Sequence, residues 1–190
     1  MDVGLDRLAS LGPLLARLRS QRIALLAHPA SVDRRLAHVS RVLAALGVRP
    51  SLIFGPEHGY GGEAQDMVGV ADARDPLTGA PIVSLYGDSF DDLSPRPERL
   101  AGVELLLVDL ADVGARYYTF VWTALLAARA AAKLGVHTVI LDRPNPIGGD
   151  ATSRSRPPIF GMRTSVRITS GPNVSTRPSA SSPLAAVSTS

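Results

Sequence analysis

The residues best suited to chemistry in this chain of 190 residues lie in the segment GPEHGYGGEAQ, residues 55–65. Glu57 supplies a carboxylate for general acid/base work, and His58 stands beside it. The surrounding glycines indicate a backbone that adopts unusual torsion angles or approaches a ligand closely. A structural role is the alternative, in which the glutamate caps the following turn and the histidine is satisfied by the backbone. The residue types alone leave both interpretations open.

A second polar segment, DLADVGARYYT at residues 109–119, combines carboxylates, a cation and aromatic rings. Arg116 suits bidentate binding of a carboxylate or a phosphate, and Asp112 lies just before it. Tyr117 and Tyr118 offer rings on which a sugar could stack. In the alternative interpretation the arginine pairs with an aspartate to fix the turn, and the tyrosines pack under the loop.

A third segment, LDRPNPIGG at residues 141–149, predicts a rigid polar turn because two of its residues are proline. Asn145 lies between the prolines and offers both a donor and an acceptor. Asp142 and Arg143 can form an internal pair. We therefore predict that Asp142 and Asn145 form one wall of a binding site.

Each polar segment follows a short apolar run, which predicts the elements that position it. Uniformly apolar runs predict buried strands at 22–27, 51–54, 81–85, 104–110 and 138–141. Apolar periodicity and end signals predict helices over 5–19 (split at Gly12-Pro13), over 33–46 (from an Asp33 N-cap to Gly47), over 95–100 and over 118–134 (to Gly135). The last of these is apolar on nearly all sides, so we expect it to be well buried.

Uniformly apolar strands that alternate with helices predict an α/β fold: a Rossmann-like, mostly parallel sheet with helices on both faces. The carboxyl ends of such strands carry the binding residues. His28 follows the first strand, Glu57 the second, Asp109 the fourth and Asp142 the fifth. We therefore expect these side chains and Arg116 to share one edge of the sheet and one site.

Composition restricts the class of partner. The chain is 45% hydrophobic and 19% charged, which is typical of a globular domain. Residues 1–150 hold 15 basic and 17 acidic residues, a formal charge of −2, so they offer no general surface for nucleic acid. No run approaches the ~18 apolar residues of a membrane span. The N-terminus shows no signal peptide, so a cytoplasmic location is expected.

Neither a cofactor nor a metal is expected from the sequence. The turn after the first strand lacks GxGxxG, and the chain has no GxxxxGK[ST], so nucleotide sites of these kinds are not predicted. Cysteine is absent, which excludes thiolate metal sites and cysteine nucleophiles. His28 and His58 with a carboxylate are too scattered to predict a metal site.

Together the motifs resemble the bacterial exo-β-N-acetylmuramidase family, formerly a domain of unknown function. The resemblance covers about residues 4–150 and rests on LIFGPEHGYGGEAQ, PIVSLYG, DVGARYYTF and LDRPNPIGG in this order and spacing. It implies removal of N-acetylmuramic acid from the non-reducing ends of peptidoglycan fragments. It also implies a Rossmann-like N-terminal domain, a smaller C-terminal domain and a site in the cleft between them. The family's favoured catalytic carboxylate corresponds to Glu57, with His58 beside it.

The proposed substrate class gives two further expectations. The lactyl group of muramic acid is a carboxylate, so Arg116 is our candidate to bind it. Glycoside hydrolysis normally needs a second carboxyl group. The candidates for that group are Glu63, Asp66, Asp109 and Asp112.

We divide the chain into a Rossmann-like domain, 1–150, and a tail, 151–190. The tail holds five arginines, 15 serines or threonines and five prolines but no acidic residue, so we expect it to be disordered. It stands where the family's second domain would begin, which indicates a truncation or a change of reading frame. Relatives in this family are often exported, whereas we expect this chain to be cytoplasmic. The predicted function is muramidase, and whether the truncated chain keeps that activity stays open. The alternatives are a non-catalytic sugar-binding remnant and a metal-dependent hydrolase of another class.

Overall fold

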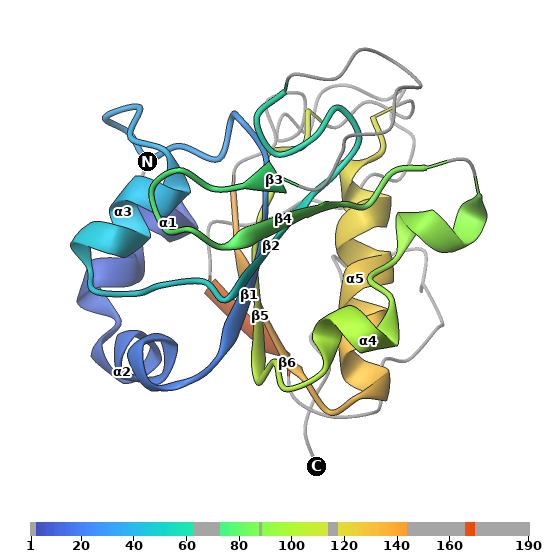
Figure 1. Cartoon of the computed structure of the whole chain (residues 1–190). Helices are drawn as coiled ribbons and strands as arrows, with labels where there is room; N and C mark the ends of the chain where they lie inside the picture. Colours follow the sequence, from blue (N-terminus) through green and yellow to red (C-terminus); the bar gives the residue numbers. More distant parts are fainter. Residues whose placement is uncertain (1–2, 63–72, 88, 114–117, 144–165, 170–190) are drawn as a thin grey trace, which may run out of the picture.

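A computed structural model describes residues 3–62, 73–87, 89–113, 118–143 and 166–169. Its centre is a seven-stranded sheet in the order β3-β4-β2-β1-β5-β6-β7 (Figure 1). The strands are β1 Ile23–Ala27, β2 Leu52–Gly55, β3 Ala73–Arg74, β4 Pro81–Ser84, β5 Leu105–Asp109, β6 His137–Leu141 and β7 Val166–Thr169. The β1–β2, β1–β5, β2–β4 and β5–β6 pairs are parallel, whereas the two edge strands are antiparallel. The predicted mostly parallel sheet is confirmed.

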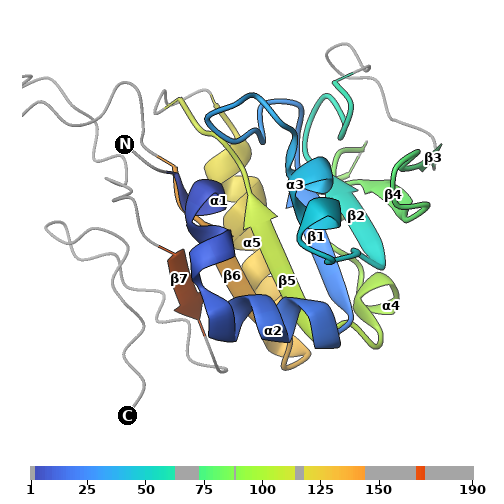
Figure 2. The ribbon, with the colours of Figure 1, turned by 90° about the vertical axis from the view of Figure 1, so that its left-hand side faces the viewer.

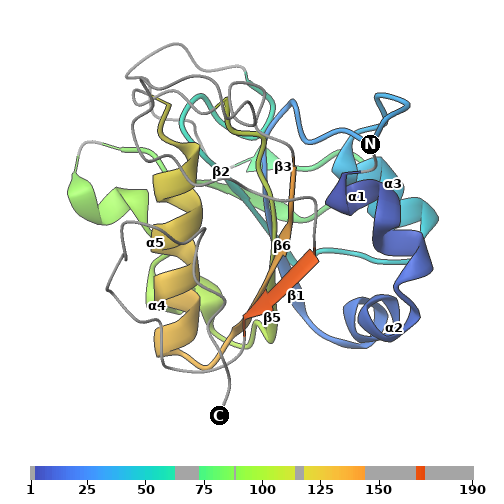
Figure 3. The ribbon, with the colours of Figure 1, turned by 180° about the vertical axis from the view of Figure 1, so that it is seen from behind.

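Helices cover both faces of the sheet, as the strand composition predicted. The helices are α1 Gly4–Arg7, η1 Leu8–Ser10, α2 Gly12–Ser20, α3 Val39–Ala45, η2 Phe90–Leu93, α4 Pro97–Leu100 and α5 Phe120–Lys133. α1, α2 and α3 lie on one face (Figure 2), and α4 and α5 lie on the other (Figure 3). The predicted split of the first helix occurs at Gly12-Pro13, where α2 begins.

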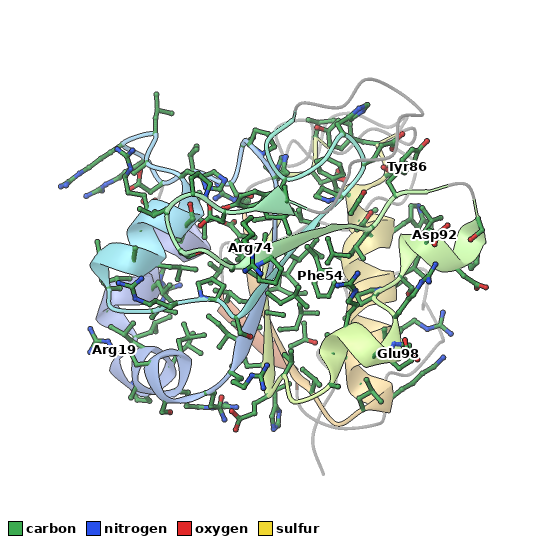
Figure 4. All side chains as sticks on the ribbon, in the orientation of Figure 1. Arg19, Phe54, Arg74, Tyr86, Asp92 and Glu98 are labelled. Atoms are coloured by element: carbon green, nitrogen blue, oxygen red, sulfur yellow. The ribbon has the colours of Figure 1, made fainter. Side chains whose placement is uncertain are left out.

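Alternate residues of each central strand enter two separate cores. In β1, Ile23 and Leu25 pack with the helices of the first face, and Leu26 packs with those of the second. All three are fully buried, as is Phe54 of β2, which points into the second core (Figure 4). The central strands must therefore be apolar on both faces, which explains their uniform composition.

The helix predicted over 33–46 begins later, because a loop takes its first residues. α3 starts at Val39, and His38 is its N-cap, accepting from the backbone N–H of Ser40. Asp33 does cap backbone amides, but they belong to the loop: its carboxylate accepts from the N–H groups of Arg35 and Ala37. A short polar side chain that binds nearby amides favours a turn as readily as a helix start. The predicted helix end at Gly47 is confirmed by its positive φ of 71°.

The helix predicted over 118–134 exists as α5, but it is less buried than the well-buried helix that its composition predicted. Of its 14 residues, four are buried, seven are half-buried and three are exposed. The buried residues of α5 are Phe120, Thr123, Ala127 and Ala131. Trp122 is 58% exposed, and Leu134, the C-cap, is 47% exposed. The alanines explain the error, since their small apolar side chains are neutral toward solvent and hide the amphipathic period.

Four residues of the tail differ from the expected disorder. Val166–Thr169 form β7, which pairs antiparallel with β6. The pattern VRIT alternates β-branched and polar residues, a strand signal too short to stand out in a serine-rich segment. The other residues of 151–190 lie outside the described part of the chain, so the expectation for the tail as a whole stays a prediction. Among the described helices, none is long and apolar enough to cross a membrane.

Candidate functional site

The carboxyl ends of the parallel strands meet at one edge of the sheet, toward the top of Figure 1. His28 follows β1, Glu57 follows β2, Asp109 ends β5 and Asp142 follows β6. The chain reverses its direction of travel across the sheet between β1 and β5, which is where ligands bind in folds of this kind. The prediction that these polar residues gather at one edge is therefore confirmed for the four that the structure describes.

Glu57 stands in a tight turn that glycine makes possible. A Cβ on Gly55 would lie 2.4 Å from the backbone nitrogen of Tyr60, so no other residue fits where the loop folds back on the strand. The N–H of Gly59 donates to the carbonyl of Pro56 at 2.9 Å and closes the turn. This turn lifts Glu57 above the end of β2 and leaves it half-exposed.

One carboxylate oxygen of Glu57 is held by the helix across the edge. The hydroxyl of Thr119, the N-cap residue of α5, donates to Oε2 of Glu57 at 2.9 Å. The two residues are 62 positions apart in sequence. In the part of the chain that the structure describes, this is the hydrogen bond that orients the carboxylate. Thr119 is a site residue that the sequence analysis missed, and a lone threonine before a helix gives no signal of such a contact.

His58 differs from Glu57 in its setting. It is exposed, and its φ of 69° lies in the left-handed region that a non-glycine residue adopts only when its surroundings impose it. Among the described residues, no hydrogen bond joins its ring to Glu57. Its part in the site stays a prediction.

Asp109 is a structural residue, not an open carboxylate. Its side chain is fully buried, and Arg143 binds it with two parallel hydrogen bonds of 2.5 and 2.8 Å. The third arginine nitrogen donates to the carbonyl of Val32 at 2.8 Å. Burial raises the pKa of the Asp109 carboxyl, and the Arg143 guanidinium opposes that rise. The predicted internal pair of Asp142 and Arg143 is thus replaced by a pair across neighbouring strands.

His28 and Ser31 fill the space between the ends of β1 and β5. The backbone N–H of His28 donates to the hydroxyl of Ser31 at 3.0 Å, and that hydroxyl donates to the carbonyl of Asp109. The Nε2 atom of His28 accepts from the N–H of Ala111 at 3.0 Å, and its ring meets Phe120 edge-on at 4.7 Å. These contacts fix the start of the loop from β5 to α5.

The contact with Ala111 requires neutral His28, because Nε2 needs its lone pair to accept the hydrogen bond from the Ala111 N–H. Burial, the Arg143 cation and His38 lower the pKa of His28 from 6.5 to about 4. In the unfolded chain His28 therefore becomes protonated near pH 6.5, whereas in the folded chain it becomes protonated only near pH 4. We expect the contribution of neutral His28 to the free energy of unfolding to be complete above pH 6.5. As the pH drops to 4, the free energy of unfolding should fall by an amount on the order of 3 kcal/mol. In His28→Gln this component of the slope should vanish, which urea unfolding at several pH values measures; an unchanged slope would contradict it.

The remaining predicted residues are placed as follows. Asp112 is half-buried and lines a hollow of about 20 Å³ with apolar residues of β5, β6 and α5, enough for about one water molecule and not for a sugar. Asp142 is 5% exposed, and its carbonyl accepts from the N–H of Gly4 at 2.8 Å. Both residues form further interactions. The predicted residues outside the described part of the chain are Glu63, Asp66, Arg116, Tyr117 and Asn145.

Of the three aromatic residues near the start of α5, two pack against each other and the third is exposed. Tyr118 is half-buried, and its ring meets Phe120 edge-on at 4.8 Å, so of its two predicted roles packing is the one observed. Trp122, one helical turn further on, is exposed. In the described ranges, no group of three or more His, Asp or Glu side chains is arranged to hold a metal ion.

The fold and the site define a class: a Rossmann-like α/β domain with a glutamate, set in a glycine turn, at the carboxyl edge of its sheet. Residues 23–155 match the family described as exo-beta-N-acetylmuramidase NamZ, N-terminal. The chain belongs to this family. A relative from Bacillus subtilis (strain 168), the peptidoglycan beta-N-acetylmuramidase NamZ, is 38% identical over 151 residues, which are 79% of this chain and 35% of the relative.

Two solved structures from Bacteroides fragilis NCTC 9343, both of DUF1343 family proteins, are similar to the chain. The first has a TM-score of 0.65 and is 33% identical in sequence. The match covers 78% of this chain and 36% of the solved chain. The second has a TM-score of 0.60 and is 28% identical in sequence. The match covers 76% of this chain and 35% of the solved chain. The chain thus spans about a third of the length of the relatives it matches.

Proposed function

We propose that this chain carries the catalytic carboxylate of a glycoside hydrolase that releases N-acetylmuramic acid from the non-reducing ends of peptidoglycan fragments. The observation that carries the proposal is the position of Glu57, raised above the carboxyl end of β2 and oriented by Thr119. The 38% identity to a peptidoglycan beta-N-acetylmuramidase supports the substrate class.

In this proposal Glu57 protonates the glycosidic oxygen as the bond breaks, a task for which it needs a fixed direction and contact with the substrate. The Thr119 contact supplies the direction, and half-exposure leaves the carboxylate accessible. His58 follows Glu57 in the same turn and is exposed. A general acid of this kind contributes about 10²–10⁴-fold in rate.

The second carboxyl group decides the stereochemical outcome. A separation of about 5–5.5 Å from Glu57 gives retention, and about 6.5–9.5 Å leaves room for water and gives inversion. Asp109 is unsuited to this role, because it is fully buried and bound by Arg143 on both oxygens. The candidates that remain are Glu63, Asp66 and Asp112.

Recognition of the sugar is assigned to the polar and aromatic residues that the sequence analysis identified. Arg116 would bind the lactyl carboxylate of muramic acid with a planar two-point contact. Tyr117, Asp112 and Asn145 would supply the further contacts, whereas Asp142 is buried. These roles follow from the residue types and from the order of the segments in the sequence, directly after predicted strands.

The proposal is tested by turnover of a chromogenic N-acetylmuramic acid glycoside. We expect a protein in which residues 1–150 continue into the rest of a family relative to be at least about 10²-fold faster than residues 1–190, because this chain spans about a third of the relatives' length and the remainder would complete the catalytic arrangement around Glu57. Binding without turnover in the extended protein would instead identify a non-catalytic sugar-binding domain. Loss of its activity on chelation would identify a metal-dependent hydrolase.

A further inference from the structure

Trp122 is the only tryptophan of the chain, and its side chain is 58% exposed. It lies in the first turn of α5, away from the face that packs on the sheet. The nearby aromatic residues behave differently, since Phe120 is buried and Tyr118 packs against it. Packing of the described residues therefore gives no reason for an indole at this position.

A short chain of contacts connects Trp122 to the proposed catalytic carboxylate. The N–H of Trp122 donates to the carbonyl of Thr119 at 3.0 Å, and the hydroxyl of Thr119 donates to Glu57 at 2.9 Å. Side chains three residues apart on a helix have Cβ atoms roughly 5–6 Å from each other. The base of the indole thus lies within about one sugar ring of the residue that orients Glu57.

The direction of the helix carries the indole toward the site. Side chains of an α-helix lean toward its N-terminus and cover the turn before their own Cα. The N-terminus of α5 lies at the carboxyl edge of the sheet (Figure 3). The indole of Trp122 is therefore expected to lean toward the turn that holds Thr119.

The chemistry of a flat, exposed indole fits a saccharide. A pyranose ring presents C–H bonds on its face and hydroxyls at its edge, and an aromatic face carries the negative charge that attracts such C–H bonds. Small-molecule sites commonly combine aromatic walls with a few polar groups. We propose that Trp122 is the platform on which the sugar bound beside Glu57 stacks; the inference rests on the proposed glycosidase function.

The single tryptophan makes the proposal directly measurable in the full chain. N-acetylmuramic acid is added while indole fluorescence and its quenching by acrylamide are recorded, and binding is measured in parallel by calorimetry. We expect a blue shift of the emission and protection from acrylamide that saturate with the binding heat. Heat without any change in fluorescence would overturn the platform and leave the glycosidase proposal intact. Absence of binding heat would count against the proposed substrate class and the platform together.

Substitution gives the second arm of the experiment. Trp122→Ala should weaken binding of N-acetylmuramic acid by roughly tenfold, and Trp122→Phe, which keeps an aromatic face, by less than about threefold. N-acetylglucosamine should be affected equally, because stacking does not involve the lactyl group. The matched control is Leu134→Ala, an exposed apolar residue at the other end of the same helix, which should leave both affinities unchanged. Equal effects of Trp122→Ala and Leu134→Ala would refute the platform.

Discussion

Glu57→Gln is expected to lower kcat for the chromogenic substrate by about 10²–10⁴-fold in the extended protein while leaving substrate affinity nearly unchanged. The amide keeps the size of the carboxylate and an oxygen that can accept from Thr119, so the fold should not suffer. It has no acidic proton to give to the leaving oxygen. Steady-state kinetics measure the separation of kcat from KM, and thermal unfolding checks the fold.

The control for this variant is Glu98→Gln. Glu98 lies on α4, far from the carboxyl edge of the sheet (Figure 4), and its substitution should leave both kinetic constants as they are. Near-full activity of Glu57→Gln would show that the catalytic assignment is wrong. Asp112 would then be the next described residue to test, since Asp109 is committed to Arg143.

Asp109→Asn is expected to destabilise the domain by about 3–5 kcal/mol, because it leaves the Arg143 cation at a buried position without its counter-charge. For a chain of this size that corresponds to a fall in Tm of roughly 10 °C. Differential scanning calorimetry measures it. The double variant Asp109→Asn with Arg143→Met should regain part of the loss, since no unpaired charge remains.

The same two residue types form an exposed pair that serves as a matched control. Arg96 binds Asp92 at 2.7 Å on the surface, where the arginine side chain is 68% exposed. Asp92→Asn should therefore change Tm far less than Asp109→Asn, because water and salt screen the interaction. Equal effects of the two substitutions would contradict the view that the buried pair fastens the ends of β5 and β6.

Most of the sheet could be predicted from the sequence because its signals are local. Continuous apolar runs identified β1, β2, β4, β5 and β6 within a residue or two at each end. A left-handed glycine ended the helices at Gly47 and Gly135. Signals spread over two to four residues, such as β3 and β7, were too short to distinguish from loop, and the alanines of α5 hid its amphipathic face.

The sequence by itself determined a parallel α/β domain with Glu57 at its carboxyl edge, since strand composition and turn glycines act over a few neighbouring residues. Only the tertiary structure decided which polar groups are available. It joined Arg143 to Asp109 across 34 positions and Thr119 to Glu57 across 62, and it left Trp122 exposed in the first turn of α5. Such pairings depend on the order of the strands, which brings distant segments together and which no local pattern of residues records.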